Sequence, residues 1–114
     1  MPSNGLTCDI SGEKAVVDPG NSSSLCEGED GLPQLITTLL DKGVSNVLLD
    51  LHRVRSIDSL ALAGIVQAHR SLTRRGGRLK IVNVGRRVRD LFEATRLASV
   101  FEIQDAKDAA TPLE

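Results

Sequence analysis

The amino-acid sequence predicts an α/β fold, and two observations on its pattern carry that prediction. Apolar stretches of strand length alternate with stretches in which apolar residues recur every three to four positions, which is the spacing of one helix face. The links between these stretches are short, which favours parallel strands joined by right-handed crossovers. The length of 114 residues is that of one domain. We therefore expect a single domain over residues 1–114, with a small mixed sheet of mostly parallel strands and helices packed on it.

The amino-terminal part begins with two short strands. Residues Leu6–Ile10 and Lys14–Val17 flank a turn that contains glycine, which predicts a hairpin or two edge strands. The stretch Asp18–Asp30 is rich in Pro, Gly, Ser and acidic residues and is expected to be a loop. A helix follows, with Pro33 in its first turn and Gly43 at its end. Its apolar face consists of Leu32, Leu35, Ile36, Leu39 and Leu40.

The central part contains a strand and the longest helix. Val47–Leu51 is almost continuously apolar, which predicts a strand covered on both faces. A helix should run from about Ser59 to Arg75, because apolar residues recur there at helical spacing and Gly76-Gly77 would stop it. The small residues within it allow close approach to a neighbouring element.

The carboxyl-terminal part repeats the alternation. Leu79–Val84 is a second apolar strand, and Val100–Ile103 is expected to form a last short strand. A third helix between them is marked by Val88, Leu91, Phe92 and Thr95. Residues 5–104 are expected to fold, whereas the small and polar residues 105–114 are expected to form a frayed tail.

Composition argues against several classes of protein. No apolar stretch approaches the roughly 20 residues that a membrane span needs, and no basic region followed by an apolar run marks a secretory signal. We expect a cytoplasmic protein that does not bind membranes. Phe92 and Phe101 are the only aromatic residues besides histidine, which weakens any interpretation that stacks nucleic-acid bases on rings.

The metal-ligating residue types are few and scattered. Cys8 and Cys26 are expected to be reduced thiols in the cytoplasm rather than a disulfide. Together with His52 and His69 they lack the close spacing of a zinc site. No Gly-x-x-x-x-Gly-Lys-Ser/Thr sequence is present to cradle a nucleotide phosphate. We therefore expect neither a metal nor another cofactor.

The link between the first apolar strand and the long helix is the candidate functional segment, because ligands of such sheets gather at the carboxyl ends of the strands. It contains Ser56-Ile57-Asp58-Ser59. Ile57 can anchor the link to the core, and Asp58 is a suitable N-cap whose carboxylate accepts from the exposed amides of the first turn. Ser59 would be the first helical residue, with its hydroxyl in solvent at a position that tolerates a phosphate. The alternative is that Asp58 and Ser59 only cap the helix.

The sequence resembles the STAS domain of bacterial anti-sigma factor antagonists. The similar residues are the apolar strand Val47–Leu51, the segment Ser56–Ser59 with its following helix, the strand that follows Gly76-Gly77, and the last helix, Val88–Phe101. The resemblance spans about Leu32 to Ile103. This chain departs from the family pattern after Ser59: Leu60 stands where the family has Ser or Ala, and Ala61 and Ala63 stand where it has Gly.

The resemblance implies a function in a partner-switching circuit that controls transcription. Such a protein binds an anti-sigma factor that is also a serine kinase of the histidine-kinase-like ATPase fold. The kinase would phosphorylate Ser59, the complex would dissociate, and a serine phosphatase would restore it. The residues around Ser59 that would contact the partner are Ser56, Ile57, Asp58, Leu60 and Ala61. No catalytic residue is expected, because the chain would be a substrate and binding module rather than an enzyme.

Other interpretations remain open at the level of sequence. One is a STAS scaffold subunit of a larger sensory assembly that is not switched by phosphorylation. A small serine hydrolase that uses Ser59 is disfavoured, because the Gly-x-Ser-x-Gly elbow is absent and His69 lies about three turns further along the helix. Arg86, Arg87 and Arg89 form either a solvated face or a contact for an acidic partner. Nucleic-acid binding is disfavoured by the net charge of −1.

Overall fold

The computed structural model describes residues 7–20, 25 and 31–105 of the chain. Within this part, strands and helices alternate as the sequence predicts. In chain order the elements are β1 (Thr7–Ser11), β2 (Lys14–Asp18), α1 (Leu32–Asp41), β3 (Asn46–Asp50), α2 (Ser59–Arg74), β4 (Arg78–Val84), α3 (Arg86–Ala94), the 3₁₀-helix η2 (Leu97–Ser99) and β5 (Glu102–Asp105). Residues 21–24 and 26–30 of the predicted loop, and the predicted tail from residue 106 onward, lie outside the described residues.

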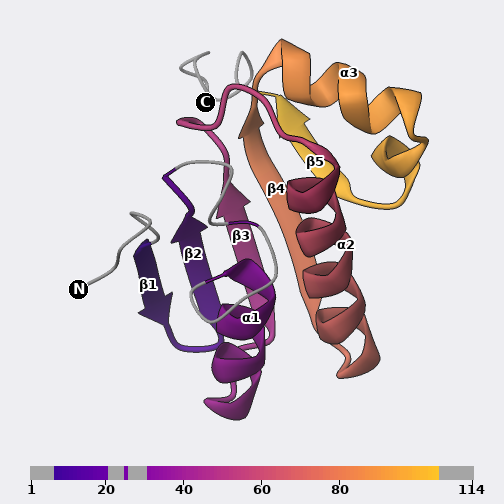
Figure 1. Ribbon diagram of the computed structural model, residues 1–114. Coiled ribbons are helices and arrows are strands. Elements are labelled where there is room, and N and C mark those ends of the chain that lie inside the picture. Colours follow the sequence, from indigo (N-terminus) through magenta and orange to yellow (C-terminus); the bar gives the residue numbers. More distant parts are fainter. Residues whose placement is uncertain (1–6, 21–24, 26–30, 106–114) are drawn as a thin grey trace.

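The five strands form one sheet in the order β1-β2-β3-β4-β5 (Figure 1). β1 pairs with β2 antiparallel, so the predicted hairpin is present, and its turn uses Gly12 with a φ of 63° that favours glycine. The pairings of β2 with β3, β3 with β4 and β4 with β5 are parallel. The predicted small mixed sheet with mostly parallel strands is therefore confirmed.

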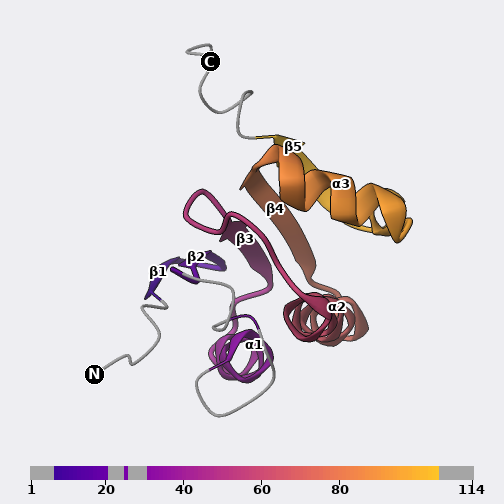
Figure 2. The same ribbon diagram turned by 45° about the horizontal axis from the view of Figure 1, so that its top comes forward.

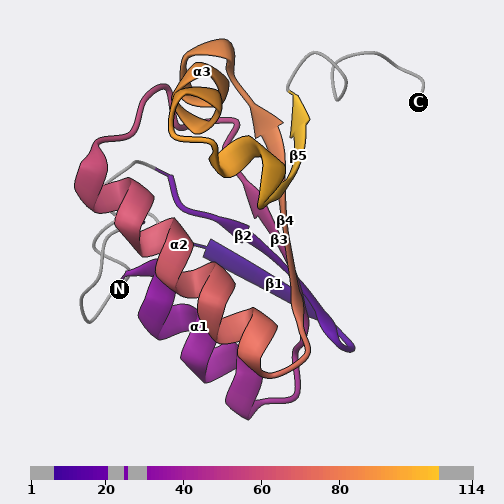
Figure 3. The same cartoon turned by 90° about the vertical axis from the view of Figure 1, so that its right-hand side faces the viewer.

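The helices lie on one face of this sheet. α1 and α2 pack side by side on that face, and α3 lies on the same side at the end where the parallel strands finish (Figures 1, 2 and 3). The prediction that Val47–Leu51 is covered on both faces is wrong. Val47 and Leu49 are buried beneath the helices, whereas Leu48 is only half-buried on the opposite face, where no described element packs. The apolar run Val47–Leu51 suggested burial on both faces because Leu48, which stands on the uncovered face, is also apolar.

The hydrophobic core fills the space between the sheet and the helices. Its largest fully buried side chains include Phe92, Leu25, Leu32, Ile36, Leu39, Leu49, Leu51, Ile65, Leu72 and Ile81. The chain between α2 and β4 passes close to Ser45, the residue before β3. A Cβ atom at Gly77 would lie 3.1 Å from Leu72 Cδ2 and inside contact distance of the Ser45 carbonyl oxygen. Glycine is thus required where α2 turns into β4, as the predicted stop at Gly76-Gly77 anticipates.

The last strand differs from the prediction. We expected it over Val100–Ile103, but β5 begins at Glu102 and ends at Asp105, so it takes the first residue of the predicted tail. The 3₁₀-helix η2 lies just before it, and Val100 is 52% exposed. Phe101 is buried instead, with its ring edge-to-face on Phe92 at 5.6 Å between centroids. The aromatic contact thereby fixes the position of Phe101, the residue directly before β5.

The described helices are too short or too polar to cross a lipid bilayer. The longest of them, α2, has 16 residues.

Candidate functional site

The link that joins β3 to α2, residues 51–58, is fixed at both ends by apolar side chains. Leu51 and Val54 are buried, and the Val54 backbone N–H donates to the Leu51 carbonyl at 3.0 Å. The Leu51 N–H in turn donates to Val82 of β4 at 3.0 Å. Near the other end, Ile57 packs against the core, as predicted. The residues between these anchors can therefore be exposed without the link losing its position.

Asp58 caps α2, which confirms the prediction. Its carboxylate Oδ1 accepts from the Ala61 backbone N–H at 2.9 Å, and its carbonyl accepts from the Leu62 N–H at 2.9 Å. The extended backbone of Asp58, with φ −102° and ψ −175°, is that of an N-cap residue. Ser59 is consequently the first residue of α2. Its side chain is exposed and makes no hydrogen bond within the described part of the chain.

Replacement of the cap tests this arrangement. Asp58→Ala should lower the free energy of unfolding by about 1 kcal/mol, because the Ala61 amide loses its acceptor. Asp58→Asn is the matched control, since asparagine caps helices about as well as aspartate and should stay within a few tenths of a kcal/mol of the wild type. Urea denaturation measures both values. Equal stability of the alanine and asparagine variants would contradict a structural role for the cap.

The residues that flank Ser59 in the chain differ in their exposure to solvent. Leu60 is 69% exposed, more than any other large hydrophobic residue in the described part of the chain. Ser56 and Asp58 are also exposed. Ala61 is fully buried in the core and its N–H donates to Asp58, so the prediction that it contacts a partner is wrong. The start of α2 therefore presents an acid, a hydroxyl and a large apolar side chain in succession.

A groove continues from Ser59 along α2. It has a volume of about 560 Å³ and is lined by Ser59, Leu62, Ala63, Val66, Gln67, Arg70, Ser71, Arg74 and Leu97. We call it the α2 groove. Its middle is apolar, with Leu62 and Val66 from α2 and Leu97 from η2, whereas Arg70 and Arg74 lie toward the far end of the helix. A partner that contacts Ser59 can thus extend over an apolar surface toward two cations.

A polar cluster at the carboxyl ends of β3 and β4 was not foreseen from the sequence. Asp50 Oδ1 accepts from Asn83 Nδ2 at 2.9 Å, from the His52 backbone N–H at 3.0 Å, and lies 3.0 Å from His52 Nδ1. Asn83 has a φ of 58°, a left-handed conformation that asparagine tolerates better than most residues. The cluster ties the end of β3 and the start of the link to β4.

The electrostatics of this cluster favour ionised Asp50. Burial of the carboxylate raises its pKa, but the hydrogen bonds from Asn83 and His52 outweigh burial, so the pKa of Asp50 lies below its ordinary value. The ionised carboxylate therefore stabilises the folded state at neutral pH.

Acid titration tests that contribution. A folded-state pKa below the unfolded value of about 3.9 means that the stabilisation is present above that value and is lost as the pH falls through the folded pKa. The free energy of unfolding should fall less between about pH 5 and pH 2 for Asp50→Asn than for the wild type. Asp90→Asn removes an exposed carboxylate outside the cluster and is the matched control. Parallel profiles for Asp50→Asn and the wild type would contradict this role.

Comparison with known proteins assigns the chain to a family. The family model of the STAS domain matches residues 22–110, most of the chain. The chain belongs to the STAS domain family. The Bordetella bronchiseptica protein BtrV, named as a candidate anti-sigma factor antagonist, is 29% identical to it over 97 residues. These residues cover 85% of this chain and 78% of BtrV.

Solved structures share this STAS fold. A candidate anti-sigma factor antagonist from Thermotoga maritima aligns with 92% of this chain and 90% of its own, at a TM-score of 0.71 and 24% identity. The phosphorylated form of the Bacillus cell-fate determinant SpoIIAA aligns with 96% of this chain and 99% of its own, at a TM-score of 0.62 and 15% identity. At these identities the likeness shows the fold, in agreement with the resemblance found in the sequence.

Within this STAS domain, the predicted arginine face lies on α3. Arg86 and Arg87 are exposed in its first turn, whereas Arg89 is half-buried and pairs with Glu93 at 3.2 Å between Nε and Oε2. Both the start of α2 and the whole of α3 lie at the end of the sheet where the parallel strands finish (Figure 3). The arginine face is thus at the same end of the domain as Ser59.

Neither histidine of the STAS domain is paired with Ser59 in the described contacts. His69 is half-buried and contacts Phe101 edge-to-face at 5.2 Å between ring centroids, and His52 is exposed beside Asp50. Among the described residues, no group of His, Cys, Asp and Glu is arranged to hold a metal ion. Cys8 is a free thiol, and Cys26 lies outside the described residues.

Proposed function

We propose that this STAS domain is an anti-sigma factor antagonist that is switched by phosphorylation of Ser59. Its partner would be an anti-sigma factor that is also a serine kinase of the histidine-kinase-like ATPase fold, and a serine phosphatase would reverse the modification. The observation that carries the proposal is the exposure of Ser59 at the first position of α2, between exposed Asp58 and Leu60 and at one end of the α2 groove. The names of BtrV and of the Thermotoga maritima protein support the anti-sigma factor antagonist part of the proposal.

The environment of Ser59 suits a phosphate without any change of fold. A phosphoserine carries about −1.5 to −2 charges, and the free amides and dipole of a helix N-terminus favour an anion. The unmodified hydroxyl makes no hydrogen bond in the described part of the chain, so a kinase would break none. The added charge would lie beside the Asp58 carboxylate, where it repels an approaching acidic surface and resists desolvation.

The binding surface in this proposal comprises Ser56, Ile57, Asp58 and Leu60, whereas Ala61 is buried beneath them. Leu60 supplies the apolar anchor, because a large exposed side chain next to the modified residue can enter a pocket of the partner. Arg86, Arg87 and Arg89 supply a basic flank for acidic residues of the partner. The domain acts in the cytoplasm as a binding module and substrate, not as an enzyme.

Phosphopeptide mass spectrometry of the protein isolated from its native cells tests the proposal. We expect phosphate on Ser59 that rises and falls with growth condition or stress. Ser56 and Ser71 serve as internal controls, since Ser56 is exposed just before the helix and Ser71 lines the same groove, and neither should be modified in parallel. A well-covered Ser59 peptide that is unmodified under every condition would favour the second candidate, a STAS scaffold subunit that binds without switching.

A further inference from the structure

The α2 groove differs in chemistry between its two ends. The amino-terminal end carries the Ser59 hydroxyl, directly after the exposed Asp58, and the far end carries Arg70 and Arg74. Among the described residues, the lining contains no acid, and neither arginine makes an ion pair. No described element lies over this side of α2 (Figure 3). Both guanidinium groups are therefore open to an anion from outside this copy of the chain.

The positions that line the groove are symmetric about the middle of α2. The lining residues on α2 are Ser59, Leu62, Ala63, Val66, Gln67, Arg70, Ser71 and Arg74. Their midpoint lies between residues 66 and 67, so Ser59 is the mirror position of Arg74. A second copy that lies antiparallel across a two-fold axis at this midpoint would place its own Arg74 level with Ser59. Such an interface needs a surface that complements itself, and the α2 groove has cations at one end only.

This arrangement keeps like charges apart. Each helical residue advances by about 1.5 Å, so the two Arg70 residues lie about 10.5 Å apart along the helix axis and the two Arg74 residues about 22.5 Å apart. A phosphate on Ser59 would lie level with Arg74 of the second copy and about one turn from its Arg70. Near the axis, Val66 would meet its counterpart, with Leu62 and Leu97 of the groove beside it.

We propose that phosphate on Ser59, the modification on which the proposed function rests, makes two copies of this domain associate through their α2 grooves. Arg70 and Arg74 of each copy bind the phosphate of the other, because arginine forms strong charge-assisted hydrogen bonds with phosphate. The two-fold axis repeats this contact. A contact of one 16-residue helix from each copy lies at or below the low end of stable interfaces, about 1,200 Å², so the unmodified chain stays mostly monomeric.

Association gives the phosphorylated state a second property. In the dimer each phosphate is covered by the arginines of the second copy, so the phosphatase reaches Ser59 only after the copies separate. The surface that binds the anti-sigma factor is withdrawn at the same time. Because association depends on mass action, the withdrawn fraction rises with the concentration of the phosphorylated chain.

Sedimentation equilibrium of the full chain tests the proposal. Phosphoserine is incorporated at position 59 during expression through a reassigned codon, so the test needs no native kinase. The dissociation constant of the dimer should be at least tenfold lower for the phosphorylated chain than for the unmodified chain. Added salt should weaken the phosphorylated dimer. A phosphorylated chain that stays monomeric at millimolar concentration would overturn the proposal.

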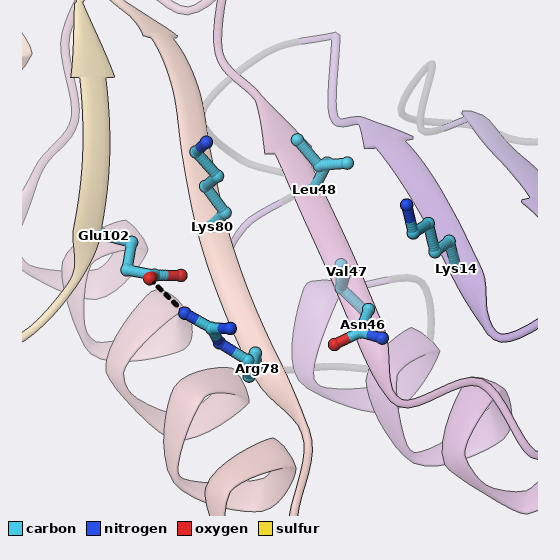
Figure 4. Close-up of a pocket in the computed structure, with 7 residues that line it drawn as sticks. All are labelled: Lys14, Asn46, Val47, Leu48, Arg78, Lys80 and Glu102. Carbon is cyan, nitrogen blue, oxygen red and sulfur yellow. Dashed lines mark hydrogen bonds and ion pairs between the residues drawn. The ribbon is translucent and has the colours of Figure 1, made fainter.

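Matched variants of the phosphorylated chain identify the surface. Arg70→Ala combined with Arg74→Ala should return the dissociation constant to that of the unmodified chain. Lys14→Ala combined with Lys80→Ala removes the same charge from exposed residues on the uncovered face of the sheet (Figure 4) and should leave the dimer unchanged. A dimer that survives the loss of both arginines, or that the lysine variant weakens equally, would contradict association through the α2 groove.

Cysteine cross-linking tests the antiparallel arrangement. In a phosphorylated chain with both native cysteines replaced by serine, Val66→Cys places a thiol next to the two-fold axis. Oxidation with copper–phenanthroline should then join two copies by a disulfide. Thr73→Cys is the control, because it would lie about 20 Å along the helix axis from its counterpart and should not cross-link. Equal cross-linking at both positions would exclude this arrangement.

Two outcomes distinguish the dimer from the phosphorylation switch. A phosphorylated chain that is monomeric and yet no longer binds the anti-sigma factor refutes the dimer and supports the proposed function. A chain whose encoded phosphoserine drives association, but whose Ser59 carries no phosphate in native cells under any condition, refutes the switch and supports the complementarity of the α2 groove.

Discussion

A Ser59→Asp variant should bind the anti-sigma factor about a hundredfold more weakly than the wild-type domain, which corresponds to about 2.7 kcal/mol of binding free energy. The new carboxylate lies directly after Asp58, and both side chains are exposed on the same surface. An interface that covers Ser59 must desolvate two adjacent negative charges, and like charges held close in an interface cost several kcal/mol. Phosphate, with its larger charge, should weaken binding at least as much.

The loss should appear in binding and not in folding. Position 59 is the first residue of α2, where the helix dipole favours an acidic side chain by about 0.3–1 kcal/mol. The melting temperature of Ser59→Asp should therefore equal or slightly exceed that of the wild type. Isothermal titration calorimetry with the anti-sigma factor measures the affinity, and calorimetric unfolding measures the stability.

Two further variants distinguish position from charge. Ser59→Ala should keep the wild-type affinity and resist phosphorylation by the kinase. Ser56→Asp adds the same charge on an exposed residue before the helix, and should cost less than tenfold in affinity. Wild-type affinity of Ser59→Asp would refute the charge switch while leaving the fold untouched. A hundredfold loss in Ser56→Asp as well would mean that the total charge of the surface matters and not the place of Ser59.

The features that sequence predicts correctly at this site are local ones. Asp58 and the first turn of α2 lie within three residues of each other, and the capping rule connects them without any tertiary information. The anchor at Ile57 follows from one apolar residue in a polar link. The positions of the strands are predicted from local sequence in the same way, because an apolar run of five or six residues between two helices has the length of a buried strand.

The features that sequence missed depend on contacts between distant residues. Asp50 and Asn83 are 33 positions apart, and only the parallel register of β3 and β4 brings them together. A signal was present, since Asp50 ends β3, Asn83 lies one residue before the end of β4, and the carboxyl ends of parallel strands meet at one edge. The place of β5 depends on Phe101, whose aromatic contacts decide which residues reach the sheet. The sequence did not indicate that helices cover only one face of the sheet, because Leu48 is apolar although it stands on the uncovered face.

Truncation of Phe92 should have the largest effect on stability of any change considered for this domain. Phe92 is fully buried, and Phe92→Ala removes a whole ring from a packed core, which costs about 3–5 kcal/mol. Val100→Ala is the control for loss of an exposed apolar side chain, since Val100 is 52% exposed, and it should change stability by no more than about 0.5 kcal/mol. Urea denaturation at an unchanged m-value measures both.

The loss of stability caused by Phe92→Ala should also be concentrated in α3. Val88 and Phe92 are the two buried residues of that helix, and the Phe92 ring contacts Phe101, which in turn contacts His69 of α2. Phe92→Ala therefore removes the larger of two anchors and breaks the aromatic chain that joins α3 to α2. Amide hydrogen exchange of α3 should accelerate more than that of β3 or β4 in this variant. Uniform acceleration throughout the domain would instead mean that α3 unfolds only together with the sheet, and that the arginine face keeps its position until the whole core opens.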